Sequence, residues 1–475
     1  MLTILGLGPG APELLTIEAR QALSEAREVW LRTARHPAVA GLPEQLEVQS
    51  FDAFYDRFPT FEGVYAAITD RVLELAQRPE GVLYAVPGHP LVAEATVAGL
   101  LARCRDERLA VRIIPGLSFV EPVLQALEVD PYSVQIGGAE GAPEDFPGLE
   151  PRTGGLQLVD ALRPAFDPAR PVLVGQVYSQ AVASALKLEL LEYYPPEHQV
   201  SLVSAAGTPE QRVRKLPLFE LDRGQPVDHL TCVYLPPLSL TENTATFEGL
   251  AGIIARLRAP GGCPWDREQT HQTLKPYLIE EAYEALDALE REDNDGLRGE
   301  LGDLLLNIVL HCQLAAEGGE FTARDVVRGI AEKLLRRHPH VFGEVQAHTP
   351  AQVVANWEAL KQEERGEEAS MLSGLPRALP ALAYTRSLQE RLAPLGLSRL
   401  AAGDEELGIR LFQLAFQAAA DGQDPEEALR RANKAFTERL ERTERLAREA
   451  GSSIQQIPQA LREELWRRAG GEAGA

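Results

Sequence analysis

A chain of 475 residues is longer than one ordinary hydrophobic core, so roughly two to four domains of ~100–200 residues are expected. Hydrophobic residues make up 45% and charged residues 25%, the balance of a water-soluble globular protein. The formal net charge of −23 makes the chain a poor partner for nucleic acid or an anionic membrane surface, because both are bound chiefly through Lys and Arg.

The acidic balance has two interpretations: it serves solubility, or it gathers some carboxylates around divalent cations. Met1–Gly6 has no basic stretch ahead of an apolar run, so a secretory signal peptide is not expected. No segment reaches the ~20 uncharged apolar residues that a membrane helix needs. The four cysteines are scattered without a CxxC pair, which fits a reduced cytoplasm and argues against a cysteine zinc site. They are Cys104, Cys232, Cys263 and Cys312.

The first half of the chain alternates short β-rich runs with helical patterns, which predicts an α/β domain. The run Leu235–Leu238 contains two prolines and cannot continue a strand, so the domain is expected to cover residues 1–238. The predicted strands are Leu2–Leu7, Gly81–Val86, Val111–Ile114, Val172–Val177, Val200–Val203 and Thr231–Leu235, and the predicted helices are Glu13–Ala26 and Glu94–Cys104.

Glycine-rich turns in this half lie at Gly6–Gly10, Tyr84–Pro90, Ile114–Phe119 and Ala205–Pro209. A glycine-rich turn between a strand and a helix lets a ligand approach the backbone closely. Taken together, these runs resemble the tetrapyrrole methylase family. The resemblance implies two α/β lobes with S-adenosylmethionine bound in the cleft between them.

Carried over by position, the resemblance implies a cofactor site made largely of backbone. Its members are Pro9, Val86, Gly88, Ser118, Ala206 and Gly207. One departure is His89, where the family commonly has an acidic residue. Because a neutral imidazole changes the charge and the hydrogen bonding of the cleft, methyl transfer to a tetrapyrrole is not expected. The sequence identifies no methyl acceptor.

From Phe247 onward, strand-like runs vanish and Ala, Leu, Glu and Arg recur at helical spacing. Two apolar stripes predict two helices, joined by the turn Glu292–Gly296, which offers N-caps and a helix-breaking glycine. Helices joined this tightly should pack antiparallel. The stripes are Leu274, Leu278, Ala282, Ala285, Leu286 and Leu289 in the first helix, and Leu301, Leu304, Leu305, Ile308, Val309 and Cys312 in the second.

Two pairs of acids lie at helical spacing on either side of this turn. Glu281 and Glu284 share one helix face, and Glu300 and Asp303 share another. Four carboxylates on facing helices are hard to keep ionised together without cations, and Mg²⁺ prefers oxygen ligands. The alternative is a solvated acidic face. The metal site is favoured because the acids flank the apolar stripe and Gly302 allows the helices to approach closely.

The runs Gly262–Asp266, Gln269–Thr270, EExxE, ExxD and Lys333–Phe342 follow in order and resemble the MazG family of nucleoside triphosphate pyrophosphohydrolases. The resemblance implies an all-α, oligomeric, Mg²⁺-dependent domain over residues 245–345, with Mn²⁺ as the alternative ion. Such enzymes cleave NTPs and dNTPs between the α- and β-phosphates. By position, the metal ligands are Glu281, Glu284, Glu300 and Asp303, and the catalytic glutamates are Glu280 and Glu281.

The remaining motif residues are candidates for substrate binding. Trp265 either stacks on a base or anchors the core ahead of the helix. Basic side chains can neutralise triphosphate oxygens, or they are ordinary surface charge; binding is favoured for Lys333 and Arg337 over Lys275 and Arg336. His338 and His340 flank a proline at a helix end, where capping is favoured over a phosphate contact.

A worn second copy of the helical motif is expected over residues 371–470. Glu300–Leu305 recurs as Glu406–Leu411, with Ile409 at the place of Asp303. The interval between Pro394 and Glu406 is too short for a copy of the EExxE helix. The second copy is therefore predicted to support structure or dimerisation rather than to form a second active site.

The whole chain resembles the methylase–MazG fusion proteins of the YabN type, a multidomain architecture with an α/β half followed by an all-α half. The leading hypothesis is a cytoplasmic Mg²⁺-dependent enzyme that acts on nucleoside triphosphates and forms a homodimer or a higher homo-oligomer. The alternatives are an S-adenosylmethionine-dependent methyltransferase whose helical half serves assembly, and a small-molecule sensor in which the first domain biases the second.

Overall fold

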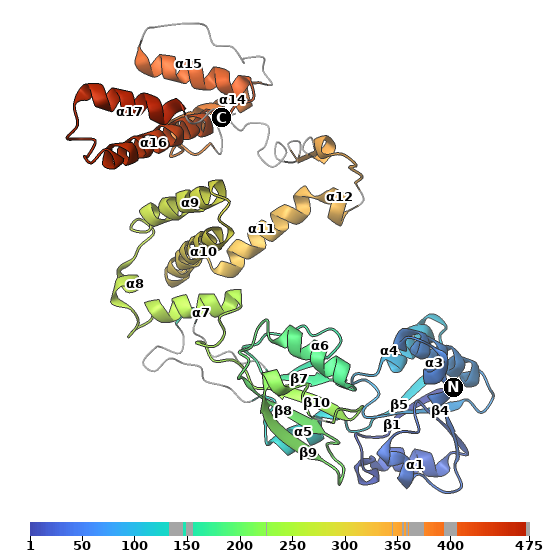
Figure 1. Ribbon diagram of the computed structural model, residues 1–475. Helices are drawn as coiled ribbons and strands as arrows, with labels where there is room; N and C mark the ends of the chain where they lie inside the picture. Colours follow the sequence, from blue (N-terminus) through green and yellow to red (C-terminus); the bar gives the residue numbers. More distant parts are fainter. Residues whose placement is uncertain are drawn as a thin grey trace. The chain divides into compact units, whose positions relative to one another are not determined.

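The computed structural model divides into two compact units, Met1–Ile330 and Ala331–Ala475 (Figure 1). No helix within its described part is long and apolar enough to cross a membrane. The structure describes residues 1–132, 146–148, 155–224, 226–343, 345–353, 356–357, 360, 375–393 and 406–471.

The first lobe is built on a parallel sheet of order β3-β2-β4-β1-β5. Its strands are β1 (Leu2–Gly6), β2 (Glu28–Leu31), β3 (Glu47–Ser50), β4 (Val82–Val86) and β5 (Val111–Ile114), and its helices are α1 (Ile17–Glu25), α2 (Asp52–Arg57), α3 (Phe61–Ala76) and α4 (Ala95–Asp106). One cluster joins α3 and α4 to the sheet, and a second joins α1 to it. A parallel sheet covered by helices presents its ligand-binding edge at the carboxyl ends of its strands.

The glycine loops at that edge pack backbone against backbone. Gly8 and Gly88 both have positive φ, +73° and +66°, and exchange backbone hydrogen bonds. A Cβ on Gly6 would lie 2.5 Å from the Gly88 carbonyl oxygen and 2.6 Å from the Gly116 nitrogen. Three loops that follow β1, β4 and β5 can therefore meet only because glycine occupies these positions.

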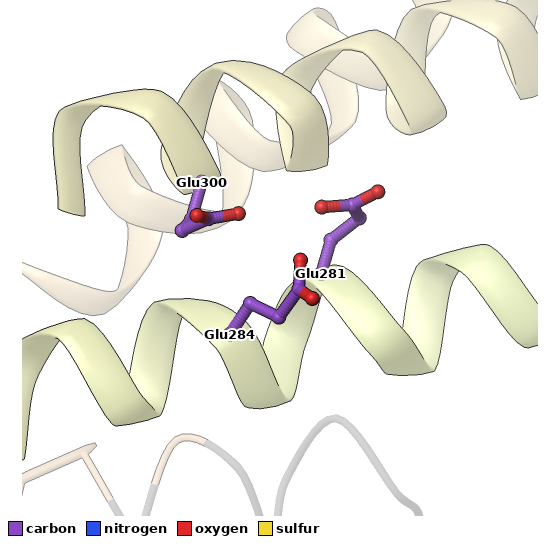
Figure 2. Close-up of side chains that lie close together, drawn as sticks. All are labelled: Glu281, Glu284 and Glu300. Atoms are coloured by element: carbon purple, nitrogen blue, oxygen red, sulfur yellow. The ribbon is translucent and has the colours of Figure 1, made fainter. Parts of the chain in front are cut away.

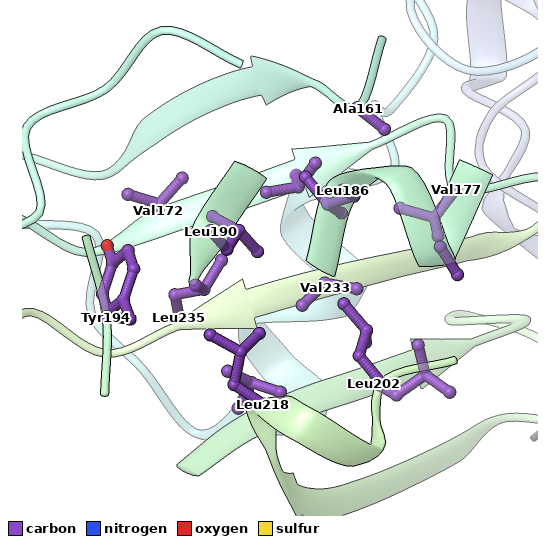
Figure 3. Packing of buried hydrophobic residues seen from close by; sticks show 14 of the residues in the cluster. Ala161, Val172, Val177, Leu186, Leu190, Tyr194, Leu202, Leu218, Val233 and Leu235 are labelled. Carbon is purple, nitrogen blue, oxygen red and sulfur yellow. The ribbon is translucent and has the colours of Figure 1, made fainter. Parts of the chain in front are cut away.

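The second lobe is a mixed sheet of order β6-β7-β10-β8-β9. Its strands are β6 (Gln157–Asp160), β7 (Val172–Gly175), β8 (Gln199–Ser204), β9 (Arg212–Pro217) and β10 (Thr231–Leu235), and its helices are α5 (Val120–Leu127) and α6 (Gln180–Leu190). Figure 3 shows Leu186 and Leu190 of α6 packed over Val172, Val233 and Leu235 of the sheet. Each of the two lobes therefore has a hydrophobic core of its own.

The helical part of the first unit is arranged around an antiparallel hairpin. It comprises α7 (Phe247–Arg258), α8 (Pro264–Glu268), α9 (Lys275–Glu290) and α10 (Asn294–Glu317), and α11 (Ala323–Arg337) continues into the second unit. Ile254, Leu274, Val309 and Leu310 form the core between α7, the start of α9 and α10. Many other leucines on α9 and α10 are exposed, so this part buries only a small core of its own.

The structure corrects two expectations about glycines in the hairpin. Gly296 does not break the helix: it lies in the first turn of α10, and its N–H donates to the Oδ1 of the N-cap Asp293 at 2.9 Å. Gly302 does not serve close helix approach within this chain, because a Cβ there would meet nothing within 4 Å. The helix starts where Asp293 satisfies its free N–H groups, and no glycine is needed to end α9.

Arg258 ties the helical part together at its base. Its guanidinium is 6% exposed and donates twice to Glu317 on α10, with Nε–Oε1 and Nη2–Oε2 distances of 2.8 Å. It also donates to the carbonyl oxygens of Asp266 in α8 and Gln269 just after α8, in the segment that leads to α9. Gln313 connects Glu317 to the carbonyl of Pro147, which belongs to the first half of the chain. One buried cation thus fixes α7, α10 and the segment that leads into α9.

The described part of the second unit contains the short helix α12 (Pro339–Phe342), which follows α11, and longer helices that pack against one another. The packed helices are α14 (Ala381–Leu392), α15 (Leu407–Ala420), α16 (Pro425–Glu449) and α17 (Gln459–Gly471). Glu406 is the N-cap of α15, so the recurring motif stands at a helix start here, whereas Glu300 lies inside α10. The interval in which no copy of α9 was expected lies outside the described residues, as do residues 371–374.

All six predicted strands are present, two of them with the predicted bounds, namely β5 and β10. The predicted helix Glu13–Ala26 is shorter: Pro12–Leu14 is a 3-10 turn, and α1 starts only after its N-cap Thr16. The expected antiparallel pairing of α9 and α10 is confirmed (Figure 1). The strands that escaped prediction are short or charged, as in β3 and β9.

We expect Arg258→Met to destabilise the α7–α10 region by about 3–5 kcal/mol, because it leaves Glu317 charged and partly buried without its partner. Hydrogen exchange of the α7 and α10 amides measures the local effect, which a whole-chain melt of several domains would blur. The exposed Arg298–Asp295 pair on α10 supplies the control, and Arg298→Met should change little. Equal protection losses in the two variants would contradict this role for Arg258.

Candidate metal centre and ligand cleft

The α9–α10 hairpin places acids of both helices in one space. Ala285 and Ala288 are the buried residues of α9, so small side chains face α10. Glu281 and Glu284 flank this face, and Glu300 comes from the opposing helix. The register follows from the short turn between the helices, which the Asp293 cap fixes.

One carboxylate oxygen from each of Glu281, Glu284 and Glu300 lies within 4.8 Å of the others. Figure 2 shows Glu281 and Glu284 rising from one helix toward Glu300 on the helix above. Glu281 and Glu300 are half-buried, and Glu284 is exposed. Three oxygen donors at this spacing match what Mg²⁺ takes from protein, and the open side leaves room for water and phosphate oxygens.

The electrostatics of the group are those of crowded anions. Partial burial, then the charges of Asp303, Glu284, Glu300 and Glu280, raise the pKa of Glu281 above its usual range. The pKa of Glu300 is raised in the same direction by burial and by Glu284 and Asp303. A site that resists ionisation for this reason is stabilised by a divalent cation. Asp303 and Glu280 are exposed and lie next to the three-carboxylate group, not within it.

Trp265 lies on α8 with 53% of its surface exposed, and its ring meets that of Tyr277 edge-on at 6.1 Å. The expectation that it anchors the core is therefore wrong, because a core anchor is buried. Lys275 is exposed and opens α9. An exposed indole and a lysine ahead of the acidic residues of α9 are available to a ligand.

The other predicted substrate-binding residues lie in the second unit, near the end of α11. Lys333 and Arg336 are exposed there, and Arg337 is half-buried. The Nδ1 of His338 lies 2.7 Å from the carbonyl oxygen of Leu334, so His338 caps this helix, as the sequence favoured.

A histidine pair beside the hairpin was not predicted. The Nδ1 atoms of His271 and His311 lie 2.7 Å apart, and the rings stack with an interplanar angle of 4°. One ring must donate and the other accept, so at least one nitrogen of the contact is unprotonated. Burial and the charge of His271 lower the pKa of His311. The pair joins the segment before α9 to α10. The two histidines lie 40 residues apart and belong to no common motif, so the sequence did not indicate that they meet.

In the first half of the chain, the lobes enclose a cavity of about 510 Å³. Of the six predicted cofactor residues, Pro9, Gly88 and Ala206 line it. The other three do not belong to the cavity lining. Val86 is buried in β4, and the Ser118 hydroxyl donates to Glu121. Gly207 has φ +77° and packs against Leu14. With Phe119 of the third turn, all four glycine-rich turns thus contribute to the cavity lining.

His89 does not belong to the described cavity lining. Its Nδ1 accepts the backbone N–H of Leu91 at 3.1 Å, which stabilises the turn after Gly88. His89 therefore influences the cleft through the conformation of the loop after Gly88, and it brings no negative charge to that loop.

A polar wall of this cavity was not predicted from the sequence. Its members include Arg32, Thr33, His36, Asp52, Tyr55 and Glu94. Arg32 and Thr33 follow β2 directly, and Asp52 lies two residues after β3. Side chains at the carboxyl ends of neighbouring parallel strands meet. The charged run after Trp30-Leu31 was the available signal, but β2 and β3 had not been predicted as strands.

Two family models match the chain. Residues 1–222 match the model of the tetrapyrrole (corrin/porphyrin) methylases, and residues 269–342 match that of the MazG nucleotide pyrophosphohydrolase domain. The second match contains the whole acidic cluster and the end of α11.

Similar proteins divide in the same way. YabN of Bacillus subtilis is 37% identical over 503 residues, covering 98% of each chain. The nucleoside triphosphate pyrophosphohydrolase/pyrophosphatase MazG of Thermotoga maritima is 38% identical over 47% of this chain and 96% of its own. The nucleoside triphosphate pyrophosphohydrolase of Escherichia coli K12 is 39% identical over 46% of this chain and 94% of its own. With one relative matched from end to end and both halves matched by their own models, the chain belongs to the family of tetrapyrrole methylase–MazG fusion proteins.

Proposed function

We propose that the helical half hydrolyses nucleoside triphosphates to the monophosphate and pyrophosphate. The observation that carries the proposal is the three-carboxylate group on facing helices, within the range that matches the MazG model. Two of the similar proteins are named for this activity. A solvated acidic face would spread its carboxylates outward instead of gathering them from two helices.

The donor set suits Mg²⁺, with Mn²⁺ as the alternative, because all three ligand atoms are carboxylate oxygens and their crowding is relieved by a cation. Glu281, Glu284 and Glu300 hold the ion, with Asp303 as a fourth ligand. When bound, such an ion offsets the charge of the phosphate oxygens and makes water a better nucleophile at neutral pH.

The chain's own groups divide the remaining work. Glu280 or Glu281 accepts the proton of the attacking water, a task suited to a carboxylate whose pKa is raised, as it is for Glu281. Trp265 stacks on the base from its exposed position on α8. Lys275, exposed at the start of α9, binds phosphate oxygens. For Lys333, Arg336 and Arg337 on α11, the same role rests on the family resemblance.

Glu281→Gln and Asp303→Asn should each lower pyrophosphate release by about a hundredfold or more, because each removes a charge from the ion's ligands while keeping the side-chain shape. Turnover with a panel of NTPs and dNTPs under saturating Mg²⁺ measures this, and circular dichroism checks the helices. Glu292→Gln, in the turn between α9 and α10, is the matched control and should turn over normally. Wild-type turnover in either test variant means that its residue does not hold the ion.

In our proposal, the degenerate second copy over residues 371–470 takes no part in the chemistry and serves structure or dimerisation. α15 starts at the equivalent of the acidic motif but carries Ile409 and exposes Leu407, Leu411 and Leu414. Exposed leucines in such numbers are expected to pack against another helix or another subunit. We infer a homodimer or higher homo-oligomer in which this unit takes part.

Deleting residues from Met371 onward should lower the melting temperature or change the oligomeric state, because short helices need tertiary packing. Glu406→Gln in the full chain should leave turnover nearly unchanged, unlike Glu300→Gln. Calorimetry and light scattering measure the first effect, and the pyrophosphate assay measures the second. The second unit would count as an active site if Glu406→Gln lowered turnover as far as Glu300→Gln at an unchanged melting temperature.

The cleft of the first half is a second candidate site, favoured by Pro9, Gly88 and Ala206 in the cavity wall. We expect S-adenosylmethionine and its demethylated product to bind weakly at best, because His89 takes the place of an acidic residue in the loop and its ring is engaged with the Leu91 N–H. Methylation of common tetrapyrrole precursors should be absent. Tight binding in calorimetry together with turnover on any such precursor would overturn this expectation.

A further inference from the structure

The polar wall of the cleft is centred on a guanidinium that its surroundings do not satisfy. Arg32 follows β2, and its Nη1 pairs with the Oε2 of Glu94 at 3.2 Å. The Nε of Arg32 is shut off from solvent and has no hydrogen-bond partner within the described part of the chain. A buried donor without an acceptor is costly, so its retention in a cavity wall points to a ligand that brings one.

Glu94 is held in place by protein groups, so it is fixed as the partner of Arg32. Its Oε1 accepts the Thr96 hydroxyl at 2.7 Å, and Thr96 in turn meets the Tyr84 hydroxyl at 2.8 Å. The Glu94 side chain is only 3% exposed, whereas that of Arg32 is 21% exposed. Glu94 therefore fixes the guanidinium through Nη1 and leaves its other nitrogens without a carboxylate from the described residues.

The other acids of the cavity wall are already satisfied. Asp52 accepts the Thr33 hydroxyl at 2.6 Å, the Ala34 N–H at 2.8 Å and the Ser50 hydroxyl at 2.9 Å. Asp228 accepts from the Leu230 N–H and the Thr231 hydroxyl. The wall's acceptors are thus occupied by the protein's own donors, and they do not call for a cation.

The tyrosine hydroxyls and the histidine of the wall keep one protonation state at neutral pH. Burial raises the pKa of Tyr55 to about 12, and burial likewise raises the pKa of Tyr65, so both phenols keep their protons. Both line the cavity with Arg32, whose charge acts on each of them. His36 beside them is uncharged at neutral pH, since burial and the charge of Arg32 lower its pKa to about 4. Arg35 also lines the cavity, but its charge acts on Asp52, whereas Arg32 keeps an Nε without a partner in the described part of the chain. Arg32 is therefore the charged donor at which a ligand's anionic group would be received.

Aromatic rings form the next part of the wall. Phe61 stacks on Tyr65 with centroids 5.9 Å apart and meets Tyr178, from the other lobe, edge-on at 5.4 Å. All three rings line the cavity, whose volume of about 510 Å³ suits one small molecule. Flat apolar walls of this kind favour a planar ring system over an extended aliphatic chain.

The charge of the Arg32–Glu94 pair limits what the site accepts. The pair is neutral as a whole, so a ligand with one negative charge leaves one excess charge in a partly buried place. The cavity lining holds two arginines, Arg32 and Arg35, against three carboxylates, Asp52, Glu94 and Asp228. A phosphate, with a charge of roughly −1.5 to −2, would therefore face an acidic wall. From this geometry we propose that the cleft binds a small planar aromatic monocarboxylate, with its carboxylate on Arg32 and its ring against Phe61, Tyr65 and Tyr178.

The test uses the full chain and 2-naphthoate as a fluorescent probe. 2-Naphthamide is its uncharged counterpart and 2-naphthyl phosphate its more highly charged one. We expect naphthoate to bind best of the three, with the amide weaker by about tenfold or more, since a hydrogen bond between charged groups is lost. Equal binding of the amide, tighter binding of the phosphate, or no binding of naphthoate at millimolar concentration would overturn the proposal.

Arg32→Gln with Glu94→Gln removes both charges together, so neither partner is left buried and unpaired. This double variant should weaken naphthoate binding by about tenfold or more. The exposed Arg103–Asp70 pair joins α4 to α3 outside the cavity, and its double glutamine variant is the matched control. Affinity that the Arg32/Glu94 variant retains in full would refute the site.

Tyr55→Phe keeps the proposal falsifiable if the double variant does not fold. It removes one hydroxyl donor and leaves the ring, so naphthoate affinity should fall a few-fold, whereas naphthamide affinity changes less. Two results together would show that the cleft has no anion site. They are an unchanged naphthoate affinity in Tyr55→Phe and a wild-type chain that binds the amide more tightly than the carboxylate.

Discussion

Crowding of carboxylates between α9 and α10 is the constraint on which the helical half depends. Glu281, Glu284 and Glu300 repel one another, and their hairpin buries little apolar surface of its own. Two contacts outside the acidic group hold the hairpin together. They are the hydrogen bond of the Asp293 cap at the turn and the ion pair of Arg258 with Glu317 at the base. The contacts at the turn and at the base thus keep the three glutamates close together. A divalent cation bound between them would relieve their mutual repulsion.

Sequence was a good guide where a local pattern carries the structure. The helical period of the apolar residues gave α9 and α10, and the i, i+3 spacing gave the acid pairs, because both depend on one helix at a time. Strands β5 and β10 were found at their bounds since they are short β-rich runs beside turn residues. Gly296 and Gly302 were misjudged because a glycine's role depends on its neighbours in space, which local patterns do not contain.

The cleft shows where prediction from sequence stops. Arg32 and Glu94 are distant in the chain and meet only because β2 pairs with β4 in the sheet. β2 and β3 lack the apolar run of β1 or β4, so neither of them was predicted. The glycine loops were recognised because their residues form motifs along the chain. A wall assembled from the ends of several strands has no such motif, so it emerges only with the sheet order.

The two sites have opposite requirements, which argues that the halves bind different ligands. The hairpin offers acceptor oxygens and needs a cation before it can face a triphosphate. In the cleft, Asp52 and Asp228 are satisfied by protein donors and Arg32 retains an unmet donor, so an anion can bind there without a metal. A nucleoside triphosphate with its ion would meet Glu94 in the cleft, and a lone carboxylate would meet three glutamates at the hairpin. Each site therefore excludes the other's ligand by charge, and a single chain can hold both without competition between them.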